Sequence, residues 1–317
     1  MTTYELAACP VCRSRSSTTV ADREQIRREL ESLWQFHLRR LQPGAPIAQL
    51  FDRAIFSQPT PLQVVQCGDC GTVFRNPREQ EEEVVATYET EAPAQESLAS
   101  LFAAQYAFYQ ERAARLTTLA GGPADVLEVG SYVGVFLRAA HDAGWRARGI
   151  DVNAHANAFA RAQGSEVEQC ALHELPSSRK FRAVALWNCF DQLPDPHDAL
   201  QRVAAVLSPG GLIALRVPNG ACYAALRGHG GPLARLLLAW NNLASFPYRH
   251  GFTPASLARL LAEHRFRVLQ QHGEVLVSIS GRYTRAWARR EERIIKRSMK
   301  LLPHRLAPWL EVYATHA

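Results

Sequence analysis

Two cysteine pairs limit what this chain can fold into more than any other feature. They are Cys9-Pro-Val-Cys12 and Cys67-Gly-Asp-Cys70. Thiolates that lie two residues apart in a tight turn can chelate one ion, and two such turns complete a tetrahedral shell of sulfurs. Because that shell leaves no open coordination position, we expect a structural Zn²⁺ ion rather than a catalytic one. The alternative is a set of free thiols that are buried or redox-active.

The segment around these pairs is too small to be held together by packing alone. Apolar residues recur at helical spacing over 22–41, which predicts a helical insert between the pairs. Residues 63–66 and 72–74 read as two short strands beside the second pair. Such strands bury little apolar surface, so a bound metal would supply the missing stability. We therefore predict a zinc-binding module over residues 1–80, with Cys9, Cys12, Cys67 and Cys70 as ligands.

The rest of the chain alternates between strand and helix signals. Strands are expected at 125–130, 146–151, 166–170, 181–188, 211–217, 266–269, 275–279 and 310–314, and helices at 134–143, 154–163 and 197–207. Alternation of this kind is typical of a parallel sheet with helices on both faces. We place a linker and a helix at 81–120 and the main domain at 121–317, with a helical insert at 220–252 and a basic helical excursion at 283–305.

Composition and charge are those of an ordinary globular protein. The 317 residues include 36 Lys or Arg and 30 Asp or Glu, which gives a formal net charge of +6. This basic balance indicates either an acidic partner or a solvated surface. Apolar runs are too short to span a membrane, and the first residues lack the features of a secretory signal. We expect a cytoplasmic protein with no membrane partner.

A glycine turn after the first strand of the alternating pattern predicts a ligand site. Val126-Leu-Glu-Val-Gly130 is an apolar strand that enters the turn, and Ser131-Tyr-Val-Gly134 opens a helix. Glycines let the backbone approach a ligand closely. The next strand ends in Asp151, whose carboxylate is well placed for ribose hydroxyls. The alternative role for Asp151 is to cap the following helix, but the turn and the acid together favour nucleotide binding.

Several segments resemble the motifs of class I S-adenosylmethionine-dependent methyltransferases. Glu128-Val-Gly-Ser-Tyr-Val-Gly134 is similar to their first motif, and Gly149-Ile-Asp151 is similar to their second. Residues 181–200 resemble the motif around their fourth strand, and Val206-Leu-Ser-Pro-Gly-Gly-Leu-Ile213 resembles the turn before their fifth. The cysteine-rich head resembles a zinc module that precedes the catalytic domain in sugar C-methyltransferases and related small-molecule enzymes.

The resemblance implies an α/β fold: a Rossmann-like, seven-stranded methyltransferase sheet with helices on both faces, preceded by the small zinc-binding module. It implies S-adenosyl-L-methionine as the cofactor, beside the structural Zn²⁺. The residues that would contact the cofactor are Glu128, Gly130, Ser131, Tyr132, Gly134, Asp151, Val152, Cys170, Ala171, Asn188, Cys189, Phe190 and Tyr109.

The resemblance also assigns parts to these residues. Glu128 and the glycine turn would lie under the methionine part of the cofactor, and Asp151 would hold both ribose hydroxyls. Val152, Cys170 and Ala171 would lie beside the adenine, while Asn188, Cys189 and Phe190 would line the site after the fourth strand. Tyr109, on the helix before the first strand, either covers the cofactor or packs in the core.

The chain departs from the family pattern at three places. Tyr132 replaces the usual middle glycine of the first motif. Cys170 and Ala171 stand where the family often has an acid beside the adenine amine. Gln192 stands where a histidine is common, which argues against proton transfer by that residue.

Methyl transfer needs a nucleophile aligned with the S–CH₃ bond, and a general base helps when the acceptor is a hydroxyl or an activated C–H group. The candidate bases are His250, Tyr248 and Asp191. The ordinary pKa of histidine suits His250 to this part. The alternative for His250 is a hydrogen bond to loop backbone.

We expect a small-molecule acceptor, such as a sugar, a nucleotide-sugar or a natural product, methylated at carbon or oxygen. Arg249 would suit an anionic acceptor. One alternative is an RNA methyltransferase that grips phosphates with the zinc module and the basic helix at 283–300. The other is a non-catalytic binding module that has kept the fold.

Overall fold

The computed structural model describes residues 3–45, 60–90, 92–229, 231–241, 243, 249–278, 280–301, 303 and 306–317. The chain forms two compact units. The first, here the cysteine unit, combines Met1–Val84, Val217–Leu257 and His272–Leu310. The second, here the sheet unit, combines Val85–Arg216, Ala258–Gln271 and Glu311–Ala317. The segments expected as insert and excursion, 220–252 and 283–305, thus pack with the cysteine unit.

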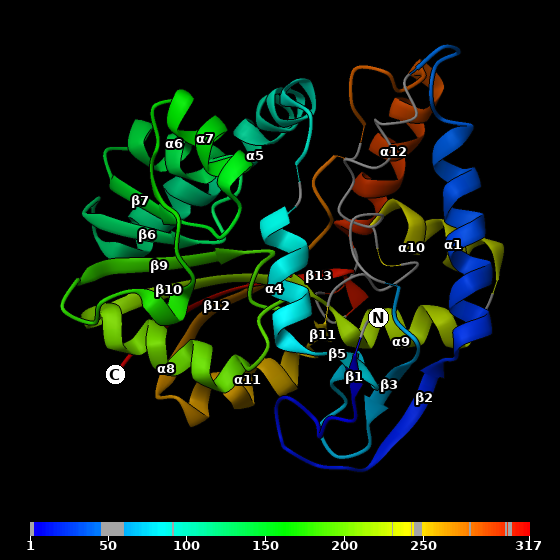
Figure 1. Ribbon diagram of the computed structural model, residues 1–317, viewed down its shortest axis with the longest axis horizontal. Helices are drawn as coiled ribbons and strands as arrows, with labels where there is room; N and C mark the ends of the chain where they lie inside the picture. Colours follow the sequence, from blue (N-terminus) through cyan, green and yellow to red (C-terminus); the bar gives the residue numbers. More distant parts are fainter. Residues whose placement is uncertain are drawn as a thin grey trace. The chain divides into compact units, whose positions relative to one another are not determined.

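A seven-stranded sheet in the order β12-β13-β10-β9-β6-β7-β8 confirms the expected fold class (Figure 1). Its strands are β6 (Asp125–Val129), β7 (Arg146–Ile150), β8 (Glu166–Glu168), β9 (Phe181–Trp187), β10 (Leu207–Pro218), β12 (Phe266–Glu274) and β13 (Trp309–His316). The neighbours from β10 to β8 pair in parallel. The chain leaves β6 toward β7 and later returns to β9 on the other side. The carboxyl ends of β6 and β9 therefore flank the crevice where such sheets bind ligands.

Helices cover both faces of this sheet, as Figure 1 shows. On one face lie α5 (Gln95–Ala120), α6 (Val135–Asp142) and α7 (Ala154–Ala162), and on the other lie α8 (Pro196–Val206) and α11 (Pro254–Glu263). Apolar residues of β6 and β9, including Val126 and Ala183, are fully buried against α5 and α6. Between β8 and β9 the chain makes only a short 3-10 turn, Leu172–Glu174.

The cysteine unit contains a four-stranded sheet in the order β11-β4-β3-β2. Its strands are β2 (Ser17–Ala21), β3 (Val64–Cys67), β4 (Val73–Arg75) and β11 (His250–Gly251). The sequence predicted β3 and β4, whereas β2 and β11 were not expected. Strand β11 joins through pairs with Phe74 and Val73 of β4, although it lies far along the chain.

The helices of the cysteine unit are α1 (Arg23–Leu38), α9 (Gly220–His229), α10 (Pro232–Trp240) and α12 (Ala286–Met299). A two-stranded ladder joins β1 (Tyr4–Glu5) to β5 (Arg78–Glu79), and α4 (Glu81–Thr90) follows. Ile26, Leu33, Tyr223 and Trp240 belong to the core of this unit. Among the described residues, no helix has both the length and the apolar character that a membrane span requires.

One expected strand is wrong. Residues 275–278 are irregular, and β12 ends at Glu274. The backbone N–H of Leu276 donates to Oδ1 of Asn241 at 3.0 Å. The apolar pattern of this segment therefore reflects burial against a side chain rather than pairing in a sheet.

Candidate active site

The glycine turn after β6 has the backbone conformation that its sequence requires. Gly130 and Gly134 have φ values of 70° and 73°, in the left-handed region that glycine adopts readily. The N–H groups of Gly130 and Ser131 both donate to the carbonyl of Ile150, at 2.9 and 3.2 Å. Tyr132 holds a positive φ of 44° without being glycine. The turn is thus fastened to the end of β7 and opens α6.

Asp151 supports this turn from the end of β7. Its carboxylate accepts the backbone N–H groups of Tyr132 and Asn153, each at 2.8 Å. The cap of α7 is Asn153, whose Oδ1 accepts the N–H of Ala156 at 2.7 Å. The capping role that the sequence left open for Asp151 therefore belongs to Asn153. Burial raises the pKa of Asp151, and the two backbone donors oppose that shift.

Two further carboxyl groups are buried near the turn. Glu128 on β6 is 3% exposed and Asp191 after β9 is 0% exposed. Within the described part of the chain, Oε2 of Glu128 and both carboxyl oxygens of Asp191 have no hydrogen-bond partner. Burial raises the pKa of both groups well above the usual carboxyl range. The charge of Asp151 adds to the rise at Glu128, while the backbone amide of Asp191 itself and then the Arg216 guanidinium oppose the rise at Asp191.

The segment after β9 packs directly on the turn. Asn188 has a positive φ of 56°, and its Oδ1 accepts a bond from Nη1 of the buried Arg216 at 2.5 Å. A Cβ atom on Gly130 would lie 2.6 Å from Sγ of Cys189. Burial, together with the carboxylates of this site, raises the pKa of the Cys189 thiol. Phe190 is fully buried.

The segments expected beside the adenine follow β7 and β8. The carbonyl of Val152 accepts a bond from Gln169 at 3.4 Å, and the N–H of Ala171 donates to Glu174 at 2.7 Å. The carboxylate of Glu174 therefore lies next to Ala171, and a contact of this segment with the adenine stays a prediction. Burial raises the pKa of the Cys170 thiol.

Tyr109 of α5 is buried in the core, with its ring centroid 6.1 Å from that of Phe136 and 6.2 Å from that of Trp187. Burial raises the pKa of its hydroxyl. These contacts are those of a core residue, and a contact with the cofactor stays a prediction. Sequence reasoning missed two residues that bond to the segment after β9. They are Arg216 of β10 and Tyr88 of α4, and neither belongs to a recognisable motif.

The other candidate bases lie elsewhere in the chain. His250 belongs to the cysteine unit, where it is buried in β11 opposite Phe74. Its ring centroid lies 6.2 Å from that of Phe252. Tyr248 lies outside the described residues. The catalytic part assigned to either residue stays a prediction.

The four predicted metal ligands come together in space. The sulfur atoms of Cys9, Cys12, Cys67 and Cys70 all lie within 4.8 Å of one another. Cys9 and Cys70 are 3.4 Å apart at sulfur, and Cys12 and Cys67 are 3.5 Å apart. None of them forms a disulfide. Sulfurs about 2.3 Å from a central Zn²⁺ would have similar spacings, so the donor set fits this metal.

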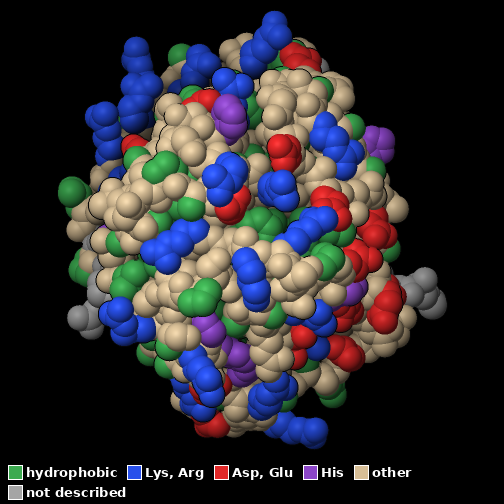
Figure 2. Space-filling model, turned by 90° about the vertical axis from the view of Figure 1, so that its left-hand side faces the viewer, with side chains coloured by type: hydrophobic (Ala, Val, Ile, Leu, Met, Phe, Trp, Pro, Cys, Tyr) green, Lys and Arg blue, Asp and Glu red, His purple; other side chains and the backbone are tan. Residues whose placement is uncertain are grey.

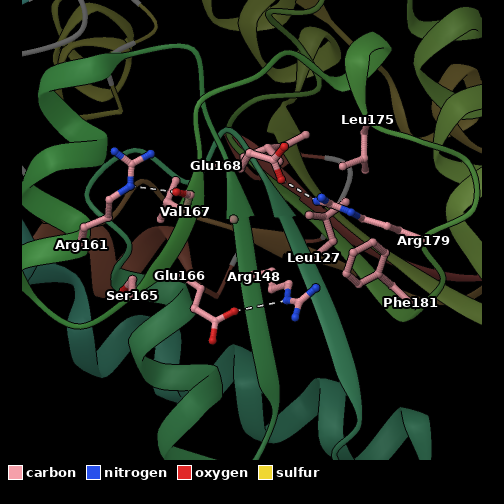
Figure 3. Close-up of a pocket in the computed structure, with 12 residues that line it drawn as sticks. Leu127, Arg148, Arg161, Ser165, Glu166, Val167, Glu168, Leu175, Arg179 and Phe181 are labelled. Carbon is pink, nitrogen blue, oxygen red and sulfur yellow. Dashed lines mark hydrogen bonds and ion pairs between the residues drawn. The ribbon is translucent and has the colours of Figure 1, made fainter.

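A cavity of about 400 Å³ lies over β6, β7 and β8, on the face of the sheet opposite to α5 and α6 (Figure 3). Leu127, Leu175 and Phe181 group on one side of it, and the Arg148–Glu166 and Arg179–Glu168 ion pairs lie beside them. Its lining includes none of the residues expected to bind the cofactor. Figure 2 shows one face of the molecule, on which basic side chains are dispersed among acidic and hydrophobic ones.

Comparisons with known proteins agree with this fold. A family model described as a methyltransferase domain matches residues 102–271, which is more than half of the chain. No curated protein shows significant sequence similarity to the chain.

Solved structures resemble the chain at low identity. An S-adenosylmethionine-dependent methyltransferase from Mesorhizobium loti is 18% identical, with a TM-score of 0.43 over 61% of this chain and 90% of that one. One from Archaeoglobus fulgidus is 17% identical, with a TM-score of 0.45 over 66% and 94%. The plantazolicin methyltransferase BpumL in complex with SAH is 12% identical, with a TM-score of 0.46 over 92% and 98%. These likenesses do not bear on the substrate of this chain.

The family match covers the residues that carry the sequence motifs and the parallel strands of the sheet. Its span contains the glycine turn, Asp151 and the segment after β9. The chain belongs to the methyltransferase-domain family, and it is an enzyme of the S-adenosylmethionine-dependent, Rossmann-like class.

Proposed function

We propose that this protein transfers a methyl group from S-adenosylmethionine to carbon or oxygen of a small molecule, such as a sugar, a nucleotide-sugar or a natural product. The observation that carries the proposal is the set of carboxyl groups around the glycine turn: Glu128 and Asp191, which are buried, and Asp151, which is partly buried. Buried carboxylates are costly unless a positive charge or a hydrogen-bond donor meets them. The sulfonium and ammonium groups of this cofactor supply both, so the residues present fit it.

In this arrangement the protein binds and orients the reactants. The cofactor supplies an activated methyl group when it is bound. Asp151, held by two backbone donors, would present its remaining lone pairs to the ribose hydroxyls. Glu128 Oε2 would accept a donor from the amino-acid part of the cofactor. Orientation of this kind supplies much of the rate in transfer between two bound groups.

A base near the acceptor would take its proton. Asp191 is a stronger base than an ordinary carboxylate once it is ionised, because burial raises its pKa. His250 is the second candidate, because a neutral imidazole can accept a proton. We propose that one of these two groups deprotonates the acceptor, and the test compares Asp191→Asn with His250→Asn in methyl-transfer assays on a panel of hydroxylated acceptors. The base is the residue whose loss lowers kcat by about 10²-fold or more without changing the Kd of the cofactor.

We also propose that Cys9, Cys12, Cys67 and Cys70 hold a structural Zn²⁺ ion. Their sulfur atoms lie close together, which supports this. A shell of four sulfurs leaves no open coordination position, as is usual for a structural zinc site. The metal would fix the turns that carry Cys67 and Cys70, between β3 and β4.

Calorimetric titration of S-adenosylmethionine into the protein tests the cofactor site. We expect micromolar binding to the wild type and its loss in Asp151→Ala. Asp125→Ala is the matched control, because Asp125 begins β6 at the opposite end and pairs with Arg146 on the surface. Absence of binding to the wild type, or equal binding by Asp151→Ala, would overturn the proposal.

One observation favours methylation of RNA as a second candidate. In the part of the chain that the structure describes, the exposed residues Arg289, Arg290, Arg293 and Arg297 of α12 form no ion pair. Guanidinium groups of this kind bind phosphates. The test is the salt dependence of RNA binding by the wild type and by a variant with these arginines changed to glutamine. Binding that weakens steeply with salt and is lost in the variant would favour RNA.

A further inference from the structure

Tyr88, near the end of α4, bonds to two segments of the predicted cofactor site. Its hydroxyl donates to Oε1 of Gln192, in the segment after β9. Its carbonyl oxygen accepts a bond from Nδ2 of Asn153, in the segment after β7, at 2.6 Å. All three residues belong to the sheet unit. None of these three residues has a part in the proposed methyl transfer.

These bonds continue into groups that touch the site. Nε2 of Gln192 donates to the carbonyl of Asn188, at the end of β9. The N–H of Asn153 donates to Oδ1 of Asp151 at 2.8 Å. A continuous series of hydrogen bonds therefore links Asn188 to Asp151 by way of Tyr88.

The order of the strands shows where this series runs. Strand β6 lies between β9 and β7 in the sheet. A link from the end of β9 to the end of β7 must therefore pass across the carboxyl end of β6, where the glycine turn begins. Cys189, next to Asn188, is in contact with Gly130 of that turn. Tyr88 thus spans the mouth of the site.

We propose that Tyr88 and Gln192 form a latch over the cofactor site, which must open for the cofactor to enter and for the demethylated cofactor to leave. The proposal rests on the proposed function. Tyr88 and Gln192 are positioning residues, because they hold the segments that carry Asp151 and Asn188 and take no part in the methyl transfer.

The latch gives Gln192 a role that its place in the motif did not explain. A primary amide both accepts and donates, so Gln192 accepts from Tyr88 through Oε1 and donates to Asn188 through Nε2. A carboxylate could only accept, and it would face the carbonyl of Asn188. In this proposal Gln192 serves to close the site through both groups of its amide.

Helix α4 buries little of its surface in the described part of the chain. Val84 is the buried residue of this helix, and it lies one turn before Tyr88. A segment with so little buried surface opens at low cost, which suits a gate. Loss of one neutral hydrogen bond should therefore change the opening rate by about fivefold.

The experiment measures release of S-adenosylhomocysteine by stopped-flow fluorescence and its Kd by calorimetry. Tyr88→Phe keeps the ring and removes the hydroxyl, and Gln192→Met keeps the shape and removes the amide. We expect each variant to raise the dissociation rate about fivefold, and the double variant to be no faster than either one, because both changes break the same link.

Tyr106→Phe is the matched control. The hydroxyl of Tyr106 also donates to a side chain, that of Asp142 at the far end of α6 from the glycine turn. This variant should release the ligand at the wild-type rate. An unfolding temperature of Tyr88→Phe close to that of Tyr106→Phe would exclude a general loss of structure.

The outcomes separate the latch from the function on which it rests. Normal binding by the wild type with unchanged release from Tyr88→Phe would overturn the latch alone, and so would additive effects in the double variant. Failure of the wild type to bind S-adenosylhomocysteine would overturn the proposed function, and the latch with it.

Discussion

A Cβ atom placed on Gly130 would lie 2.6 Å from Sγ of Cys189, which is closer than real Cβ contacts allow. The turn after β6 and the segment after β9 are therefore packed in direct contact at the carboxyl end of the sheet. A glycine is required at this point both for its left-handed backbone and for the space that it leaves.

Gly130→Ala should lower stability and abolish cofactor binding. Gly164→Ala is the matched control, because Gly164 also has a left-handed backbone, with φ of 85°, but has no atom within 4 Å of the added Cβ. The control should cost about 1–2 kcal/mol from backbone strain alone. Gly130→Ala should cost more, as measured by urea unfolding. Equal losses in the two variants would show that the contact with Cys189 relaxes freely.

Glu128→Gln should change stability and cofactor binding in opposite directions. Burial raises the pKa of Glu128, so the folded protein keeps a proton that the unfolded chain loses above about pH 4.3. Wild-type stability therefore falls as the pH rises through the range between these two pKa values. Glutamine cannot ionise, and the variant should be more stable at pH 8, by on the order of 1–3 kcal/mol.

The check on Glu128 is urea unfolding of both proteins at pH 4.5 and pH 8, with calorimetry of S-adenosylmethionine binding at pH 8. The two stabilities should converge at the lower pH. The variant should bind the cofactor more weakly, because an amide, unlike a carboxyl group, cannot ionise to meet the positive charge of the cofactor. Parallel pH profiles would show that the pKa of Glu128 is the same in the folded and unfolded states, and they would sink the prediction.

Removal of one cysteine from the cluster should release the metal. The wild type should contain about one zinc ion per chain by elemental analysis, and Cys67→Ser should contain little. Cys170→Ser is the control, because Cys170 lies outside the cluster and should leave the zinc content unchanged. Treatment with a chelator should lower the unfolding temperature of the wild type, because metal binding stabilises a small module. A metal-free wild type of full stability would contradict the zinc assignment.

Glu311→Gln should be strongly destabilising. Glu311 on β13 accepts bonds from Arg112 at 2.9 Å and from Tyr313 at 2.7 Å, and both ends of the Arg112 pair are buried. Loss of this carboxylate would remove the buried counter-charge of Arg112 and leave its guanidinium with the exposed Glu111, at a cost of about 3–5 kcal/mol. Glu166→Gln, which breaks the exposed pair with Arg148, should cost under about 1 kcal/mol. Similar losses of unfolding free energy in the two variants, measured with denaturant, would contradict the expected difference between the buried and the exposed ion pair.

Local patterns predicted much of the candidate site. The glycine turn, Asp151 and the segment around Cys189 lie next to one another in the structure, because the ends of neighbouring parallel strands meet at one edge. The sequence did not separate the two roles of Asp151, since spacing alone does not say which side chain caps α7. The structure gives the cap to Asn153.

The sequence by itself determined the class of fold, the glycine turn with its acid and the set of four cysteines that cluster. These features depend on periodicity, on glycine conformations and on the spacing of sulfur donors, which are local properties of the chain. Tertiary structure alone decided that β11 pairs with β4, that Arg216 bonds to Asn188 and that Tyr88 spans Asn153 and Gln192. Such contacts join residues far apart in the chain, and packing and burial select them rather than any local pattern.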